Sequence, residues 1–178
     1  MDLDKSSPES IKEAVEALRV IEFYYFDFKV GPALFYSYPK GKFSKELSDR
    51  VCEAMDIQDS ETNFTYSFEG IISLNHYFKI DSEWARGKKE MCMVSIILDK
   101  EAKPELKDKI TTSCGNLMKA MKLSKGMYSA FYKDHVKAHE EDKDEILSNR
   151  SMLKAWIKNV HEEIFGDYDL IVQSNSET

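Results

Sequence analysis

Apolar residues gather in short runs of strand length over the first hundred positions of the chain. Residues 18–29, LRVIEFYYFDFK, are rich in aromatic and β-branched side chains, which favour strands. Gly31 and Pro32 break this run, and residues 33–38 have the composition of a returning strand. The pattern therefore predicts a hairpin near the start of the chain.

Two further segments predict the rest of a sheet. Residues 64–80 alternate between apolar and polar positions, with Gly70 permitting a bend and Asn75 offering a second turn. Residues 91–98 form an unbroken apolar run bounded by charges, which is typical of a buried central strand. Counting 64–80 as two strands, we expect five strands in all.

Segments before, between and after these strands have the periodicity of helices. Serine and proline near residues 6–8 predict a short helix before the first strand, and Ser44 predicts the cap of a helix over residues 45–55. After Asp99 the whole pattern is helical.

Three C-terminal helices are expected. One begins near Pro104 and runs to about Lys122, and Gly126 separates it from a second helix that contains His135. Residues 149–165 have a full apolar face that includes Trp156, with Gly166 as the expected end of the helix. A charged stretch, HEEDKDE, should face solvent, and the tail QSNSET should fray.

The element order predicts an α/β protein. Two strands, a crossing helix and three more strands need cover on each sheet face, which an α/β/α or a two-layer sandwich provides. We divide the chain into a polar segment with a short helix (1–17), a sheet domain (18–125), and C-terminal helices packed on the same domain with a frayed tail (126–178).

Composition narrows the function classes. A net charge of −7 disfavours general nucleic-acid binding and non-specific binding to anionic membranes. The cysteines Cys52, Cys92 and Cys114 lack metal-ligand spacing and are expected to be small buried hydrophobes in a reducing compartment. The first ten residues do not resemble a signal peptide, and no apolar run reaches membrane-spanning length. We therefore expect a soluble cytoplasmic protein.

The charged bend over residues 81–90 carries the main candidate chemistry. Arg86 would project from a short loop held between two strands, either as an ordinary solvated charge or as a guanidinium that reaches another molecule's phosphates. Trp84 would either dock a partner or fold back on the sheet. Asp81 and Ser82 are expected to cap the turn through side-chain to backbone hydrogen bonds.

Other chemistry has little support in the sequence. Phosphate-binding glycine motifs and serine-nucleophile motifs are absent. His135 and His139 stand four residues apart, as in some zinc sites, but no third ligand has a fixed spacing. We therefore predict that the chain has no metal site and no cofactor of its own.

The bend and the strand after it resemble the longin domain of the folliculin and nitrogen permease regulator-like family. In that domain an aromatic strand ends in K-D-S, an A-R-G follows, and a strand of S-I-I type ends in an acidic-basic pair. The first hairpin is also similar to the family's opening hairpin. The resemblance covers about residues 20–121, and the matching residues are Asp81-Ser82, Ala85-Arg86-Gly87, Ser95-Ile96-Ile97, Asp99, Phe26, Gly31-Pro32 and Pro39.

The resemblance implies a longin-like (profilin-like) fold, with a five-stranded mainly antiparallel sheet and extra C-terminal helices. It also implies that Arg86 is an arginine finger that stimulates GTP hydrolysis by a Ras/Rag-like small GTPase, which would carry the GTP and Mg²⁺. Trp84, Gly87, Lys88 and Lys89 would then contact the partner. The spacing between Asp81-Ser82 and the A-R-G is one residue longer than in folliculin, and folliculin's DENN-type module has no counterpart in this sequence.

A non-catalytic role is the alternative. Longin domains also act as adaptors that bind a small GTPase, or pair with a second longin or roadblock subunit, through exposed sheet edges. On that interpretation Arg86 is an interface residue. Either role allows recruitment to membranes through partners.

Overall fold

The computed structural model describes residues 17–174, without the side chains of residues 136–138 and 168–174. Residues 1–16, where the short N-terminal helix was predicted, and the last four residues of the tail therefore lie outside the described residues.

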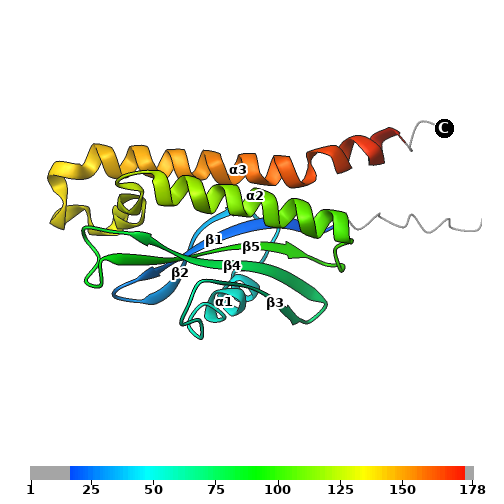
Figure 1. Cartoon of the computed structure of the whole chain (residues 1–178), viewed down its shortest axis with the longest axis horizontal. Coiled ribbons are helices and arrows are strands. Elements are labelled where there is room, and N and C mark those ends of the chain that lie inside the picture. Colours follow the sequence, from blue (N-terminus) through cyan, green and yellow to red (C-terminus); the bar gives the residue numbers. More distant parts are fainter. Residues whose placement is uncertain (1–16, 175–178) are drawn as a thin grey trace, which may run out of the picture.

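Five strands form one antiparallel sheet in the order β2-β1-β5-β4-β3, which confirms the predicted strand count (Figure 1). β5 lies at the centre, as its unbroken apolar run predicted, and β2 and β3 are the edges. Gly70, with φ of 76°, makes the turn that separates β3 from β4. The strand bounds are β1 Arg19–Asp27, β2 Gly31–Tyr38, β3 Thr62–Phe68, β4 Ile71–Asp81 and β5 Lys89–Leu98.

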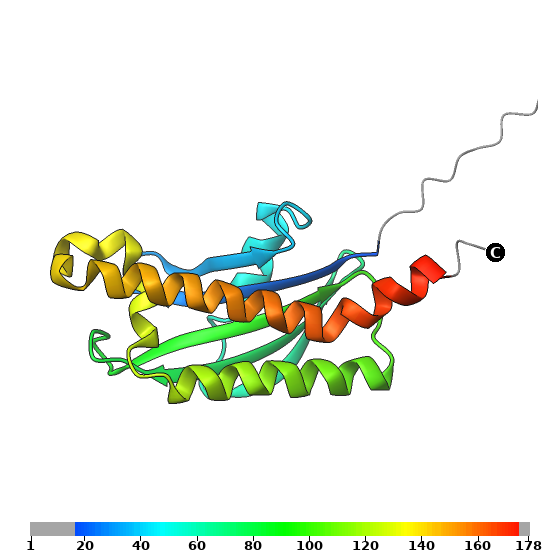
Figure 2. The ribbon, with the colours of Figure 1, turned by 90° about the horizontal axis from the view of Figure 1, so that it is seen from above.

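Helices cover both faces of the sheet, which gives an α/β/α arrangement. The two long helices lie side by side over one face, and α1 lies on the other (Figures 1 and 2). Ser44 caps α1 by accepting a hydrogen bond from the Leu47 backbone N–H. The bounds are α1 Lys45–Glu53, α2 Pro104–Leu123, the 3-10 helices η1 Met127–Ala138 and η2 Glu140–Asp142, and α3 Lys143–Ser174.

Each face of the sheet has its own apolar core because alternate strand residues point to opposite sides. Phe23 and Val94 lie in the core beneath α2, α3 and η1, whereas Tyr24 and Met93 lie in the core beneath α1. The three cysteines are free and buried in these cores, as predicted. None of the helices within residues 17–174 is both long enough and apolar enough to cross a membrane.

Three details of the sequence prediction are wrong. Asn75 makes no turn, since it is buried in the middle of β4, where Phe64 and Ser95 are its cross-strand neighbours. Gly166 does not end the last helix, because its backbone stays helical and α3 runs on to Ser174. The helix expected around His135 is a kinked 3-10 segment, with non-helical backbone angles at Tyr132 and at His135 itself.

Candidate functional site

The loop that carries Arg86 is the connection between two adjacent strands of the sheet. β4 ends at Asp81 and β5 begins at Lys89, and these two residues are cross-strand partners joined by an ion pair. The Ser82 backbone N–H donates to the Lys88 carbonyl at 3.0 Å, which continues the ladder by one step. The tip of the loop therefore comprises only five residues on a firmly paired base.

Ser82 holds the interior of this loop. Its side-chain oxygen accepts hydrogen bonds from the backbone N–H groups of Trp84 (3.2 Å) and Ala85 (3.0 Å), and its hydroxyl donates to Glu90 Oε1 at 2.8 Å. Ser82 is 4% exposed. The structure thus assigns the capping expected of Asp81-Ser82 to Ser82, while the Asp81 carboxylate binds Lys89.

Arg86 lies at the tip of the loop and is exposed. Among the described residues, neither nearby carboxylate, Asp81 or Glu83, forms an ion pair with it. Lys88, also exposed, donates from Nζ to the Glu83 carbonyl oxygen at 3.1 Å. The guanidinium of Arg86 is therefore available to a group outside the chain.

Trp84 is half-buried and folds back, although onto η1 instead of the sheet. Its indole stacks on His139 with ring centroids 3.9 Å apart and meets Tyr128 and Tyr132 edge-on at 5.2 and 5.1 Å. Only part of the ring is open to a partner. The indole thus ties the loop to the C-terminal helices.

Gly87 is exposed, and a Cβ built on it would meet nothing within 4 Å. The left-handed residue of the loop is Lys88, with φ of 60°. Within the chain, the space around position 87 would therefore accept a side chain.

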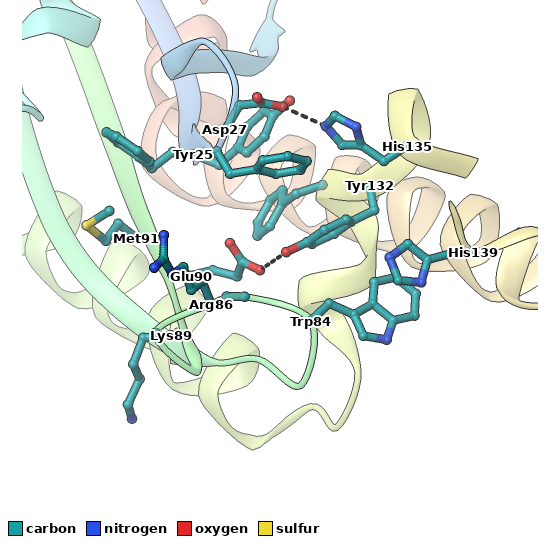
Figure 3. Close-up of a pocket in the computed structure, with 15 residues that line it drawn as sticks. Tyr25, Asp27, Trp84, Arg86, Lys89, Glu90, Met91, Tyr132, His135 and His139 are labelled. Atoms are coloured by element: carbon teal, nitrogen blue, oxygen red, sulfur yellow. Dashed lines mark hydrogen bonds and ion pairs between the residues drawn. The ribbon is translucent and has the colours of Figure 1, made fainter. Parts of the chain in front are cut away.

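A pocket of about 500 Å³ opens beside the loop. Three separate segments form it: the end of β1 with Phe28 after it, the β4–β5 hairpin, and η1 with His139 after it. In Figure 3 the hairpin residues Arg86 and Glu90 lie across from His135 and His139. Its lining comprises Tyr25, Phe26, Asp27, Phe28, Trp84, Ala85, Arg86, Gly87, Lys89, Glu90, Met91, Phe131, Tyr132, His135 and His139.

Glu90 is the residue of this site that sequence reasoning missed. It is 6% exposed, and its Oε1 accepts hydrogen bonds from the Tyr132 hydroxyl at 2.7 Å and from Ser82. Burial raises the pKa of the Glu90 carboxyl above its usual value, although the two hydrogen bonds oppose this shift. Strand alternation offered a signal, because Glu90 shares the inward parity of Cys92 and Val94.

Asp27 is the second buried acid of the pocket. It accepts hydrogen bonds from the backbone N–H groups of Lys29 (2.7 Å) and Val30 (3.1 Å), and His135 Nε2 lies 3.0 Å from its other oxygen. Burial alone would raise the pKa of Asp27, but these hydrogen bonds outweigh it and lower the pKa. Asp27 thus joins the β1–β2 turn to η1.

The two histidines considered as metal ligands have separate roles, with His135 bound to Asp27 and His139 stacked on Trp84. Among the side chains that the structure describes, histidine, cysteine, aspartate and glutamate form no group of three that could hold a metal ion. The site therefore combines the exposed Arg86 guanidinium with an aromatic pocket in which Glu90 and Asp27 already accept hydrogen bonds from the protein.

No protein-family model matches this chain, and a search of curated proteins found no similar sequence.

Proposed function

We propose that this protein is a longin-type regulator that stimulates GTP hydrolysis by a Ras/Rag-like small GTPase, with Arg86 as the arginine finger. The observation that carries the proposal is the exposed Arg86 guanidinium at the tip of a short hairpin loop, without an ion pair to Asp81 or Glu83. The five-stranded antiparallel sheet with flanking helices is compatible with a longin-like fold.

The chemistry of phosphoryl transfer explains why such a residue would matter. Charge spreads over the oxygens of the transferred phosphoryl group in the transition state, and a planar cation supplied by another protein stabilises that charge. A finger of this kind is worth about 10³–10⁵ in the rate of hydrolysis. GTP and Mg²⁺ would be carried by the GTPase, so Arg86 would be the only catalytic group that this chain supplies.

Neighbouring residues would position the finger or contact the partner. Ser82 anchors the loop from within, and Trp84 packs against η1, so both support the geometry of Arg86. The exposed Gly87, Lys88 and Lys89 would face the GTPase, where the two lysines favour an acidic surface. We place the protein in the cytoplasm, with recruitment to membranes through its partners.

Single-turnover GTP hydrolysis by candidate Ras- and Rag-like GTPases tests the proposal. Wild-type protein should accelerate hydrolysis, and Arg86→Ala should abolish the acceleration while still binding the GTPase. Lys100→Ala is the control, because it removes an exposed cation that lies outside the loop, and it should retain the acceleration. Equal acceleration by wild type and Arg86→Ala would refute the finger.

A second candidate function is a non-catalytic longin adaptor. The observation that favours it is the pair of edge strands, β2 and β3, each of which has only one strand neighbour among the described residues. An open sheet edge can pair with a strand of another longin or roadblock subunit. Binding of a GTPase or of such a subunit with no change in hydrolysis rate would select this function.

A further inference from the structure

We propose that the pocket beside Arg86 binds a small molecule with a flat aromatic body and a carboxylate group. This proposal goes beyond GTPase activation and does not depend on it. A volume of about 500 Å³ is typical of small-molecule sites, which span about 300–1,000 Å³. The ligand class follows from the walls of the pocket and from the charges within it.

Aromatic rings form the walls. Tyr25 and Phe131 are stacked, with ring centroids 5.0 Å apart and planes 9° from parallel, and Trp84 also lines the pocket. Phe28 is 65% exposed at the rim, where its ring lies 4.6 Å from that of His135. A flat apolar ligand would bury this exposed ring and stack on its neighbours.

The charged residues that line the pocket indicate which polar group the ligand should carry. Both acids are satisfied within the protein, Glu90 by Ser82 and Tyr132, and Asp27 by His135 and two backbone N–H groups. Lys89 is held by Asp81. Arg86 lines the pocket and has no ion pair among the described residues, so the uncommitted charge is positive (Figure 3).

A guanidinium favours a carboxylate because its parallel N–H groups match the two oxygens. The alternative is a ligand with a positively charged group, which the aromatic rings and the Glu90 carboxylate would bind. The hydrogen bonds that Glu90 already accepts, and its raised pKa, argue against that assignment.

Three naphthalene probes of similar shape distinguish these assignments: 2-naphthoate, 2-naphthalenemethanol and 2-naphthylmethylammonium. Each is titrated into the full-length protein, with binding followed by calorimetry and by ligand-observed NMR. We expect 2-naphthoate to bind about tenfold more tightly than the neutral alcohol, as one charged hydrogen bond provides. The ammonium probe should bind most weakly.

Variants at exposed positions locate the binding without disturbing the fold. Arg86→Gln should remove the advantage of 2-naphthoate and leave the alcohol unaffected, whereas Phe28→Ala should weaken both probes. Lys88→Gln is the control, because Lys88 is in the same loop but does not line the pocket, and it should change neither affinity. Tighter binding of the ammonium probe, an equal effect of Arg86→Gln on both probes, or no binding of 2-naphthoate at millimolar concentration would overturn the proposal.

Discussion

At the residue scale, a buried carboxylate organises the candidate site. Glu90 accepts hydrogen bonds from Ser82 of the same hairpin and from Tyr132 of η1, so one oxygen joins the loop to the C-terminal helices. Burial raises its pKa, which means that folding favours the protonated form relative to the unfolded chain. The contribution of Glu90 to stability is therefore greatest below its unfolded pKa, and it falls as the pH rises through the folded pKa.

This linkage predicts the pH dependence of a Glu90→Gln variant. The free energy of unfolding of the variant, minus that of the wild type, should increase as the pH rises from 4.5 toward neutrality, because the variant lacks the ionisable group. Urea denaturation at a series of pH values measures the difference. A difference for Glu90→Gln that decreases with pH would contradict the assignment.

At the element scale, two glycines in the C-terminal half have opposite roles. Gly126 lies between α2 and η1 with φ of 79°, and its carbonyl accepts a hydrogen bond from Asn149 at 3.0 Å. Gly166 continues the helical backbone of α3 and has no neighbour within 4 Å of an added Cβ. A glycine terminates a helix only where it adopts the left-handed conformation, which explains why the sequence pattern misplaced the end of α3.

Alanine substitutions should separate these roles. Gly166→Ala should stabilise the protein by about 0.5–1 kcal/mol, because alanine loses less backbone freedom in a helix. Gly126→Ala should destabilise it by more than about 1 kcal/mol, since the backbone conformation is strained for alanine and the new Cβ would lie 2.7 Å from Glu145 Oε1. Chemical denaturation of both variants measures the free energies, and stabilisation by Gly126→Ala would contradict this account.

At the scale of the whole molecule, Phe23 connects the layers. This ring of β1 meets Phe35 of β2 and Phe78 of β4 edge-on, with centroids 6.0 and 6.2 Å apart, and stacks parallel to Phe131 of η1 at 6.0 Å. Phe131 in turn lines the pocket. Packing of the sheet core and formation of the candidate site therefore depend on the same cluster of rings.

Truncation of Phe23 should destabilise the protein far more than truncation of an exposed ring. Phe23→Ala should destabilise the fold by about 3–5 kcal/mol, as deletion of a fully buried ring leaves a cavity. Phe28→Ala, at a 65% exposed ring, should change stability by less than about 0.5 kcal/mol. Thermal and urea denaturation measure both effects. Similar losses for the two variants would show that the ring cluster is not the centre of the core.

Local sequence determined the strands, the capped helix α1 and the hairpin loop of Arg86, because apolar periodicity and turn residues act over a few neighbouring positions. Tertiary structure determined the conformation where it differs from the local preference. Asn75, for example, favours turns but is buried between β3 and β5. Tertiary structure also decided the pocket, since residues 25–28, 84–91 and 131–139 meet only after the sheet and η1 have packed. Strand alternation places Glu90 on the inward face, but its contact with Tyr132 and the packing of Trp84 depend on long-range contacts that local sequence does not specify.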